Sequence, residues 1–188
     1  MYRNYHRPFG LGAVGILISI NVVLFLATYI YNPLFSRLGL QPAVVWSRPW
    51  TLITAMFLHA GMGHLLTNML TLYFFGEFLT RLIGEERFLI IYLLGGFVGN
   101  VLYALLGPRF AIAVGASGAV FALGGTLAVL RPRQPVFVFP IPMPIPLWVA
   151  VIFGFIILSF FPGIAQEAHL GGLLFGLGAG YLLKKRRW

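Results

Sequence analysis

Ala-Val-Gly-Ala-Ser-Gly-Ala-Val-Phe at residues 113–121 and Glu-Ala-His-Leu-Gly-Gly at residues 167–172 are the two stretches that decide the fold. The first contains Ser117 and the second contains His169, each in a segment rich in small and apolar residues. A serine among small residues is, by itself, more often a helix-packing site than a nucleophile. A histidine inside a membrane span is costly, and such residues usually have a function. Together the two stretches indicate a serine and its base held within a membrane.

The composition is that of a membrane protein with several spans. The 188 residues are 60% hydrophobic and 9% charged, and the mean hydropathy is +0.92, whereas about 25% of a soluble domain is charged. The net charge of +9 would suit a nucleic-acid partner. However, the basic residues lie between apolar segments rather than in a patch with interleaved aromatic residues. We therefore expect the charge to set membrane topology, and we expect no nucleic-acid partner.

The residue inventory excludes several kinds of active site. The chain has no cysteine, which removes disulfides, thiolate metal sites and cysteine nucleophiles. It also has no aspartate, and its carboxylates are Glu77, Glu85, Glu86 and Glu167. Because Glu167 is only two residues from His169, the two side chains point from different sides of a helix. A Ser-His dyad without a third carboxylate remains, and we expect neither a metal ion nor another cofactor.

Six apolar segments predict an all-α membrane protein that forms one domain over residues 1–188, since about 20 apolar residues cross a bilayer as a helix. The expected spans are residues 9–31, 64–83, 88–107, 117–130, 145–161 and 168–183. The first run is too long for the core of a signal peptide, so we expect it to be retained. Alternating prolines at residues 140–146 predict an extended approach to the fifth span.

The distribution of basic residues predicts the orientation of these spans. Ten of the thirteen lie on one side of the expected six-span arrangement. They are Arg3, Arg7, Arg81, Arg87, Arg131, Arg133, Lys184, Lys185, Arg186 and Arg187, against Arg37, Arg48 and Arg109 on the other side. Basic loops stay in the cytoplasm, so both termini are expected there, in a multi-pass protein of the cell membrane.

Three polar residues are expected at one depth in the membrane. Helix rise places Ser117 about 21 Å, His169 about 22 Å and His64 about 25 Å from the basic loop that follows each one. In a hydrocarbon core about 30 Å thick, this level lies below the extracytoplasmic surface. A serine and base that hydrolyse a bond at that depth require water, so we expect a hydrophilic cavity that opens to the extracytoplasmic side.

Glycine-lined helix faces are expected to bring the serine and the histidine together, as small residues do between membrane helices. Positions three, four, seven and eight residues apart share a side of a helix. These residues are Phe121, Gly124 and Gly125 on the face of Ser117, and Gly172, Gly176 and Gly180 on the face of His169.

The second span supplies two further polar side chains, His64 and Asn68, which are four residues apart and share a face. An asparagine in a membrane helix can simply link helices. Next to a nucleophile, its amide and the His64 ring could donate hydrogen bonds to a developing oxyanion. His59 lies upstream of the glycines, and we expect it to hold its loop by hydrogen bonds.

Three motifs occur together in this chain. They are His59-x4-His64-x3-Asn68, Gly115-Ala116-Ser117-Gly118 and Ala168-His169-x2-Gly172-x3-Gly176. Their combination resembles the rhomboid family of intramembrane serine proteases, from the loop after the first span to the end of the sixth.

The resemblance implies a six-helix fold and assigns a role to each motif. It implies Ser117 as nucleophile and His169 as general base, with His64, Asn68 and the Ser117 backbone N–H around the oxyanion. It also implies supporting positions for Gly115 and Phe121. The implied substrates are single-span membrane proteins, which would reach the site laterally near the fifth span and the loop after it.

Three positions depart from the family pattern. Phe121 stands where many bacterial members have a tyrosine, so the ring is kept and the hydroxyl is lost. The usual Trp-Arg pair of the first loop appears as Trp50-Thr51, with Arg48 two residues earlier. Thr80 stands where the family often has a glutamate between two glycines.

The sequence thus predicts a serine endopeptidase that cleaves transmembrane segments through an acyl-enzyme, and two alternatives stay open. One is a catalytically inactive rhomboid-like protein that binds membrane proteins. The other is a small transporter, which is less favoured because transporters usually couple through carboxylates or broken helices in paired repeats. A metal site built from His59, His64 and His169 is disfavoured because no His-Glu-x-x-His run is present.

Overall fold

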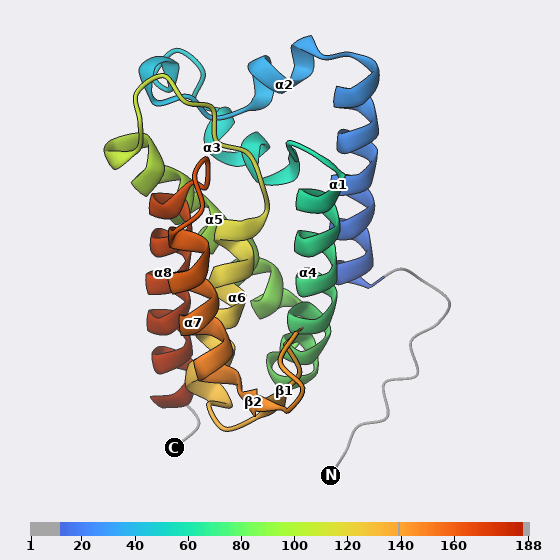
Figure 1. Cartoon of the computed structure of the whole chain (residues 1–188), viewed down its shortest axis with the longest axis vertical. Coiled ribbons are helices and arrows are strands. Elements are labelled where there is room, and N and C mark those ends of the chain that lie inside the picture. The colour runs from blue at the N-terminus through green and yellow to red at the C-terminus, as the bar shows by residue number, and fades with distance from the viewer. Residues whose placement is uncertain (1–11, 139, 186–188) are drawn as a thin grey trace.

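The structure, a computed structural model, describes residues 12–138 and 140–185 and is built mainly from helices (Figure 1). Six of the helices in this part of the chain have 13 or more residues. They are α1 (Ala13–Ile30), α4 (Met62–Ile83), α5 (Glu85–Leu106), α6 (Ser117–Leu130), α7 (Leu147–Ser159) and α8 (Gln166–Lys185). Each corresponds to one of the six segments expected from the sequence. Residues 9–11, where the first segment was expected to begin, lie outside the described residues, as do Arg3, Arg7, Arg186 and Arg187.

The six long helices run alternately up and down, so α1 begins and α8 ends at the same end of the bundle (Figure 1). Two of them, α1 and α5, are long and apolar enough to cross a membrane, while α6 and α7 are apolar but shorter. Large apolar side chains such as Val23, Leu70 and Phe153 are exposed on the outside of the bundle. Extensive exposed apolar surface of this kind marks a membrane or protein interface.

Short helices and loops between α1 and α4 cover the opposite end of the bundle (Figure 1). They are α2 (Pro33–Leu38), η1 (Pro42–Val44), α3 (Thr51–Thr54) and η2 (Ala55–Phe57). The Arg48 guanidinium Nη1 donates to the Ser36 carbonyl at 3.2 Å, and the Trp50 indole N–H donates to the Arg37 carbonyl at 3.1 Å. Trp50 and Arg48 therefore attach this loop to the end of α2, although Arg48 lies two residues before the tryptophan rather than directly after it.

The all-α expectation omitted one small element. Between α6 and α7 the strands β1 (Pro135–Val136) and β2 (Ile145–Pro146) form an antiparallel ribbon, with Pro135 opposite Pro146. The extended approach predicted from the prolines is present here, because proline disfavours helical conformation in the residue before it. The strand pairing itself was not foreseen.

Helix α6 lies at the centre of the bundle and packs against α4, α5, α7 and α8, most extensively against α8. Ten of its fourteen residues are buried. A helix that is apolar on all sides is stable only when other elements surround it. Thr126 Oγ1, 3.0 Å from the Gly176 carbonyl, adds a hydrogen bond across the α6–α8 contact.

Candidate active site

The Ser117 hydroxyl and the His169 ring meet between α6 and α8. Ser117 is the first residue of α6, and His169 lies in the first turn of α8. The distance from Ser117 Oγ to His169 Nε2 is 2.7 Å, and the His169 side chain is only 5% exposed. In a neutral imidazole one nitrogen accepts and the other carries the proton. When Nε2 accepts the Ser117 proton, the arrangement is that of a nucleophile and its base.

Glycines allow these two side chains to approach because they let α6 and α8 touch through their backbones. A Cβ atom on Gly172 would overlap the Gly118 carbonyl oxygen, and one on Gly176 would overlap the Ala122 carbonyl oxygen. A Cβ on Gly180 would lie 2.9 Å from the Thr126 carbonyl oxygen. The contacts recur every four residues along both helices, which is the spacing of one helix face.

The sequence predicts that Gly124 and Gly125 lie on the Ser117 face, where α6 meets α8. This is confirmed for Gly125 and wrong for Gly124. A Cβ on Gly125 would lie 2.8 Å from the Leu173 carbonyl oxygen of α8. A Cβ on Gly124 would instead meet Phe75 of α4 and Val151 of α7, at 3.1 and 3.2 Å. Adjacent residues of a helix with 3.6 residues per turn point about 100° apart, so the two glycines serve different neighbours.

Helix α5 holds the His169 turn from the other side, which the sequence analysis missed. A Cβ on Gly99 would lie 2.5 Å from the Ala168 carbonyl oxygen, and one on Gly171 would lie 2.9 Å from Gly99 Cα. The signal was present in the sequence as Gly95-Gly96-x2-Gly99, a small-residue face in the third apolar segment.

The ring of His169 is supported by Phe121. The two ring centroids lie 4.8 Å apart with an interplanar angle of 39°. Phe121 in turn makes an edge contact with Phe155 of α7, at 5.8 Å between centroids. The phenyl ring therefore restricts the orientation of the imidazole without the hydroxyl of a tyrosine.

Gly115 brings His64 against the backbone that leads to Ser117. Its φ is +132°, a conformation that residues with side chains rarely adopt. A Cβ at this position would lie 2.8 Å from both Cε1 and Nε2 of His64. The Gly115 N–H donates to the Ala55 carbonyl at 2.9 Å, which attaches this loop to η2. The His64 ring and the Ser117 hydroxyl consequently flank one short piece of backbone.

Asn68 lies one turn after His64 on α4 and is buried. Its Nδ2 donates to the His64 carbonyl at 2.8 Å, so this hydrogen bond stays within its own helix rather than reaching Ser117. A carboxamide NH₂ has two hydrogens, and this bond uses one of them.

The expectation that His59 holds its loop by hydrogen bonds is wrong. Both ring nitrogens of His59 are buried without a hydrogen-bond partner in the described part of the chain. The ring makes an edge contact with His64, at 5.0 Å between centroids. Burial, and then the neighbouring His64, lower the pKa of His59 in this loop to about 3. Within residues 12–138 and 140–185, no three His or carboxylate side chains are grouped so that they could hold a metal ion.

Comparison with known proteins places this arrangement in a family. The sequence model described as the rhomboid domain matches residues 47–186, which include every residue of the site. The chain belongs to the rhomboid family.

Several rhomboid relatives are similar in sequence. RHOMBOID-like protein 4 of Arabidopsis thaliana is 38% identical over 149 residues, which are 78% of this chain and 37% of that protein. The putative rhomboid protease YdcA of Bacillus subtilis is 43% identical over 76 residues, 40% of this chain and 38% of YdcA. The rhomboid protease GluP of the same bacterium is 35% identical over 133 residues, 69% of this chain and 25% of GluP. The chain thus spans less than half the length of these rhomboid proteins.

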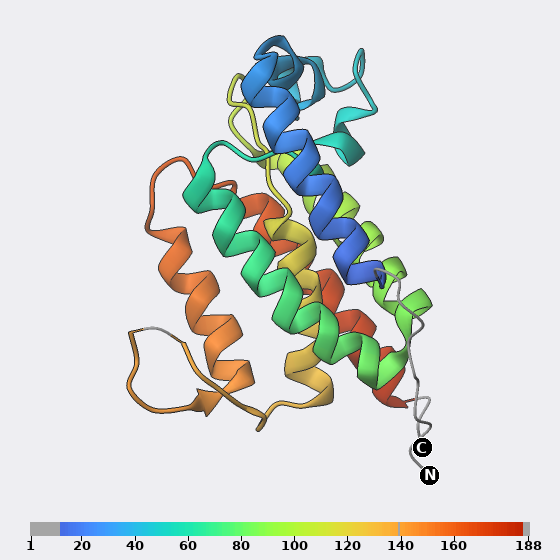
Figure 2. The same ribbon diagram turned by 90° about the vertical axis from the view of Figure 1, so that its right-hand side faces the viewer.

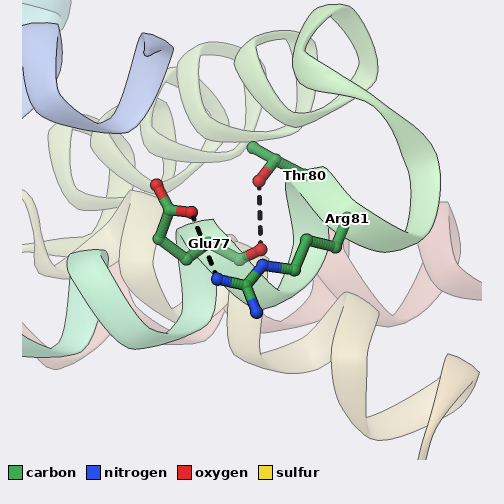
Figure 3. Close-up of polar contacts among 3 residues, drawn as sticks. All are labelled: Glu77, Thr80 and Arg81. Atoms are coloured by element: carbon green, nitrogen blue, oxygen red, sulfur yellow. Dashed lines mark hydrogen bonds and ion pairs between the residues drawn. The ribbon is translucent and has the colours of Figure 1, made fainter. Parts of the chain in front are cut away.

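Thr80, the third departure from the rhomboid pattern, lies near the end of α4 (Figure 3). It donates its hydroxyl to the Glu77 carbonyl at 3.0 Å, within the helix. The Glu77 carboxylate pairs with Arg81, at 3.9 Å between Oε2 and Nη2. The Arg81 side chain is largely exposed, and exposed ion pairs contribute little to stability.

Proposed function

We propose that this rhomboid protein is an intramembrane serine endopeptidase with Ser117 as nucleophile and His169 as general base. The observation that carries the proposal is the 2.7 Å separation of Ser117 Oγ and His169 Nε2. As Ser117 Oγ attacks the scissile carbonyl, its proton passes to Nε2 and then to the leaving amine. Water then hydrolyses the acyl-enzyme, with the same imidazole removing a proton from the water.

The proposed oxyanion site lies between Ser117 and α4, on the side of Ser117 that faces away from α8. Its donors are His64 Nε2, the second hydrogen of the Asn68 amide and the Ser117 N–H. The last of these belongs to the first turn of a helix, where N–H groups have no intrahelical partner. Gly115 supports this site by admitting the His64 ring, and Phe121 supports the base.

All six long helices cross the bilayer in this proposal, in a single rhomboid-type domain of the cell membrane. The end that carries α2 and α3 faces the extracytoplasmic side, and both termini are cytoplasmic. The exposed apolar side chains of the bundle and the ten-to-three distribution of basic residues support this orientation. Helix α6 begins below the upper ends of α1 and α5 (Figure 2). In the proposed orientation Ser117 lies beneath the surface and requires a water-filled cavity that opens outward.

The proposed substrates are transmembrane segments of single-span membrane proteins, with no role for nucleic acid. Access past α7 is supported by its sparse packing, because its only buried residues among those described are Leu147 and Val151, both in the half that begins at the cytoplasmic end. The upper half of α7 can therefore yield to a substrate at low cost in buried contacts.

Labelling with a fluorophosphonate in detergent tests the proposed dyad. A serine activated by a neighbouring base reacts at its hydroxyl, so the label is expected on Ser117 of the unmodified protein. It should be absent from Ser117→Ala and strongly reduced in His169→Ala. If the unmodified, folded protein does not label, the alternative of an inactive membrane-protein binder is favoured instead.

Replacing Asn68 by alanine is expected to reduce cleavage without abolishing it. The lost amide is one of three proposed oxyanion donors, and removal of such a donor costs about 10²-fold in kcat. KM should change little, because the oxyanion forms only in the transition state. The measurement is the rate of cleavage of a reconstituted substrate over a range of substrate concentrations.

A matched control for Asn68 is its neighbour Thr67, whose exposed hydroxyl bonds to the Gly63 carbonyl of its own helix. Thr67→Ala should leave both kinetic constants unchanged. An unaltered kcat in Asn68→Ala would remove the amide from the proposed oxyanion site.

A further inference from the structure

The ribbon of residues 135–146 has an unusual composition for a loop between two helices. Its sequence is Pro-Val-Phe-Val-Phe-Pro-Ile-Pro-Met-Pro-Ile-Pro, without one charged or hydrogen-bonding side chain. Loops exposed to water are normally polar, because apolar side chains there gain nothing from burial. Such a composition indicates that a non-aqueous partner covers the ribbon.

Little of the ribbon is buried by the protein itself. The Phe137 side chain is 79% exposed and that of Met143 is 63% exposed, and Pro140, Pro142 and Pro144 are exposed as well. Only Val136 among its described apolar residues packs against the main core. The described residues between β1 and β2, 137–138 and 140–144, lie to the side of the bundle beyond α7 (Figure 2). This part of the chain therefore lies beside the bundle, and its exposed apolar residues are not covered by α7.

The base of the ribbon is fixed to the beginning of α7. The Leu147 N–H donates to the Gln134 carbonyl at 2.9 Å, and the Trp148 N–H donates to the Pro132 carbonyl at 3.3 Å. Both N–H groups belong to the first turn of a helix and would otherwise lack backbone partners. The buried Leu147 side chain adds an apolar attachment at the same point. An interaction that fixes the position of the ribbon therefore also fixes the position of the first turn of α7.

The surroundings of the ribbon match the surface of a membrane. Arg131 and Arg133 lie between the end of α6 and the ribbon, and the half-exposed Trp148 lies two residues after the ribbon. Basic side chains next to a membrane are attracted to anionic headgroups. Tryptophan is enriched at the level where headgroups meet hydrocarbon. The apolar outer face of α7, with Phe153 and Ile156 exposed, continues upward from this level.

We propose that the ribbon of residues 135–146 is a membrane-binding element, whose apolar turn inserts into the cytoplasmic leaflet while Arg131 and Arg133 bind anionic lipid headgroups. It thereby anchors the cytoplasmic end of α7 to the bilayer. The inference rests on the membrane orientation proposed above, but it does not depend on the Ser-His dyad.

The backbone of the ribbon limits how deep it can go. Unpaired N–H and C=O groups are not tolerated in the hydrocarbon core. Five of its twelve residues are prolines, which have no N–H, and Ile141 donates its own to the Val138 carbonyl. The prolines lower the number of N–H donors, but the remaining unpaired N–H groups and carbonyls still require water or headgroups. The ribbon therefore lies at the boundary of headgroups and acyl chains, as interfacial segments do.

Single thiols can report this position, because the chain contains no cysteine. Phe137→Cys and Met143→Cys replace exposed side chains and are labelled with an environment-sensitive fluorophore. The labelled proteins are reconstituted into vesicles of phosphatidylcholine and phosphatidylglycerol. Quenching is measured with a phospholipid carrying a nitroxide high on its acyl chain, and separately with aqueous iodide. Phe153→Cys on α7 serves as the lipid reference and Glu86→Cys, exposed at the beginning of α5, as the water reference.

The expected result is that the labels at residues 137 and 143 are quenched by the nitroxide lipid several-fold more than the label at residue 86, and by iodide several-fold less. If these labels behave like the one at residue 86, the ribbon lies in water and the proposal is overturned. Protection from both quenchers, with energy transfer between labelled copies that rises with protein density, would identify a second copy as the partner and also overturn it. If the label at residue 153 is not quenched by lipid, the membrane orientation itself fails.

The role of the two arginines is tested in the same assay. In vesicles of phosphatidylcholine alone, lipid quenching at residue 137 should fall about two-fold or more, since the anionic headgroups are missing. Arg131→Gln combined with Arg133→Gln should lower the quenching equally in the mixed vesicles and remove its dependence on phosphatidylglycerol. If quenching is unchanged by both the lipid and the substitutions, headgroup binding by these arginines is refuted.

Discussion

Ser117→Ala is expected to abolish cleavage of a reconstituted single-span substrate, and His169→Ala should do nearly the same. Both side chains act in one step, in which Ser117 Oγ attacks as His169 Nε2 removes its proton, so losing either removes the reaction. The expected fall in kcat is at least about 10³-fold for each variant, and the double variant should be no worse than Ser117→Ala, since members of one catalytic unit are not additive. The measurement is the cleavage rate in vesicles for all three variants.

This loss should not reflect unfolding. Ser117→Ala removes one hydrogen bond at a half-buried position and leaves the α6–α8 backbone contacts intact. A matched control is Ser159→Ala, which removes a hydroxyl that donates to the Phe155 carbonyl within α7. That variant should keep its rate. A normal cleavage rate in Ser117→Ala would end the proposal of a serine protease at this site.

Gly172→Ala is expected to lower the free energy of unfolding by about 3 kcal/mol, as overpacking a close-packed contact does. The added Cβ would overlap the Gly118 carbonyl oxygen, which belongs to backbone and cannot move aside as a flexible side chain would. The two helices must therefore separate, which also lengthens the hydrogen bond between Ser117 and His169. Unfolding in mixed micelles with increasing denaturing detergent measures the first effect, and fluorophosphonate labelling measures the second.

The matched control on the same helix is Gly178→Ala, because a Cβ at Gly178 would meet no atom within 4 Å. This variant should be as stable as the unmodified protein or slightly more stable, since alanine favours a helix over glycine by about 1 kcal/mol. If both substitutions had the same effect, α8 would not be held against α6 by backbone contact.

Much of the fold could be predicted from the sequence because apolar runs and their breakers are local signals. The start of α6 at Ser117 and its end at Leu130 agree with the expected span 117–130. The ribbon between α6 and α7 was missed because two-residue strands leave no periodic pattern, and only the extended proline segment was evident. The shared face of Gly172 and Gly176 followed from helix spacing, whereas the different neighbours of Gly124 did not.

The sequence by itself determined which groups are available for chemistry. It contains neither cysteine nor aspartate, and it places a serine and a histidine each at the start of a helix face lined by small residues. Helical periodicity is a local property, so the sequence also determined that Gly172 and Gly176 lie on the same helix face as His169. Only the tertiary structure decided the partners of these groups. Three features depend on segments far apart in the chain. They are the contact of Gly99 in α5 with the Ala168 carbonyl, the contact of the His64 ring with Gly115, and the nitrogens of His59, which have no partner among the described residues. Their distances are set by the packing of several helices at once, and no local pattern encodes that.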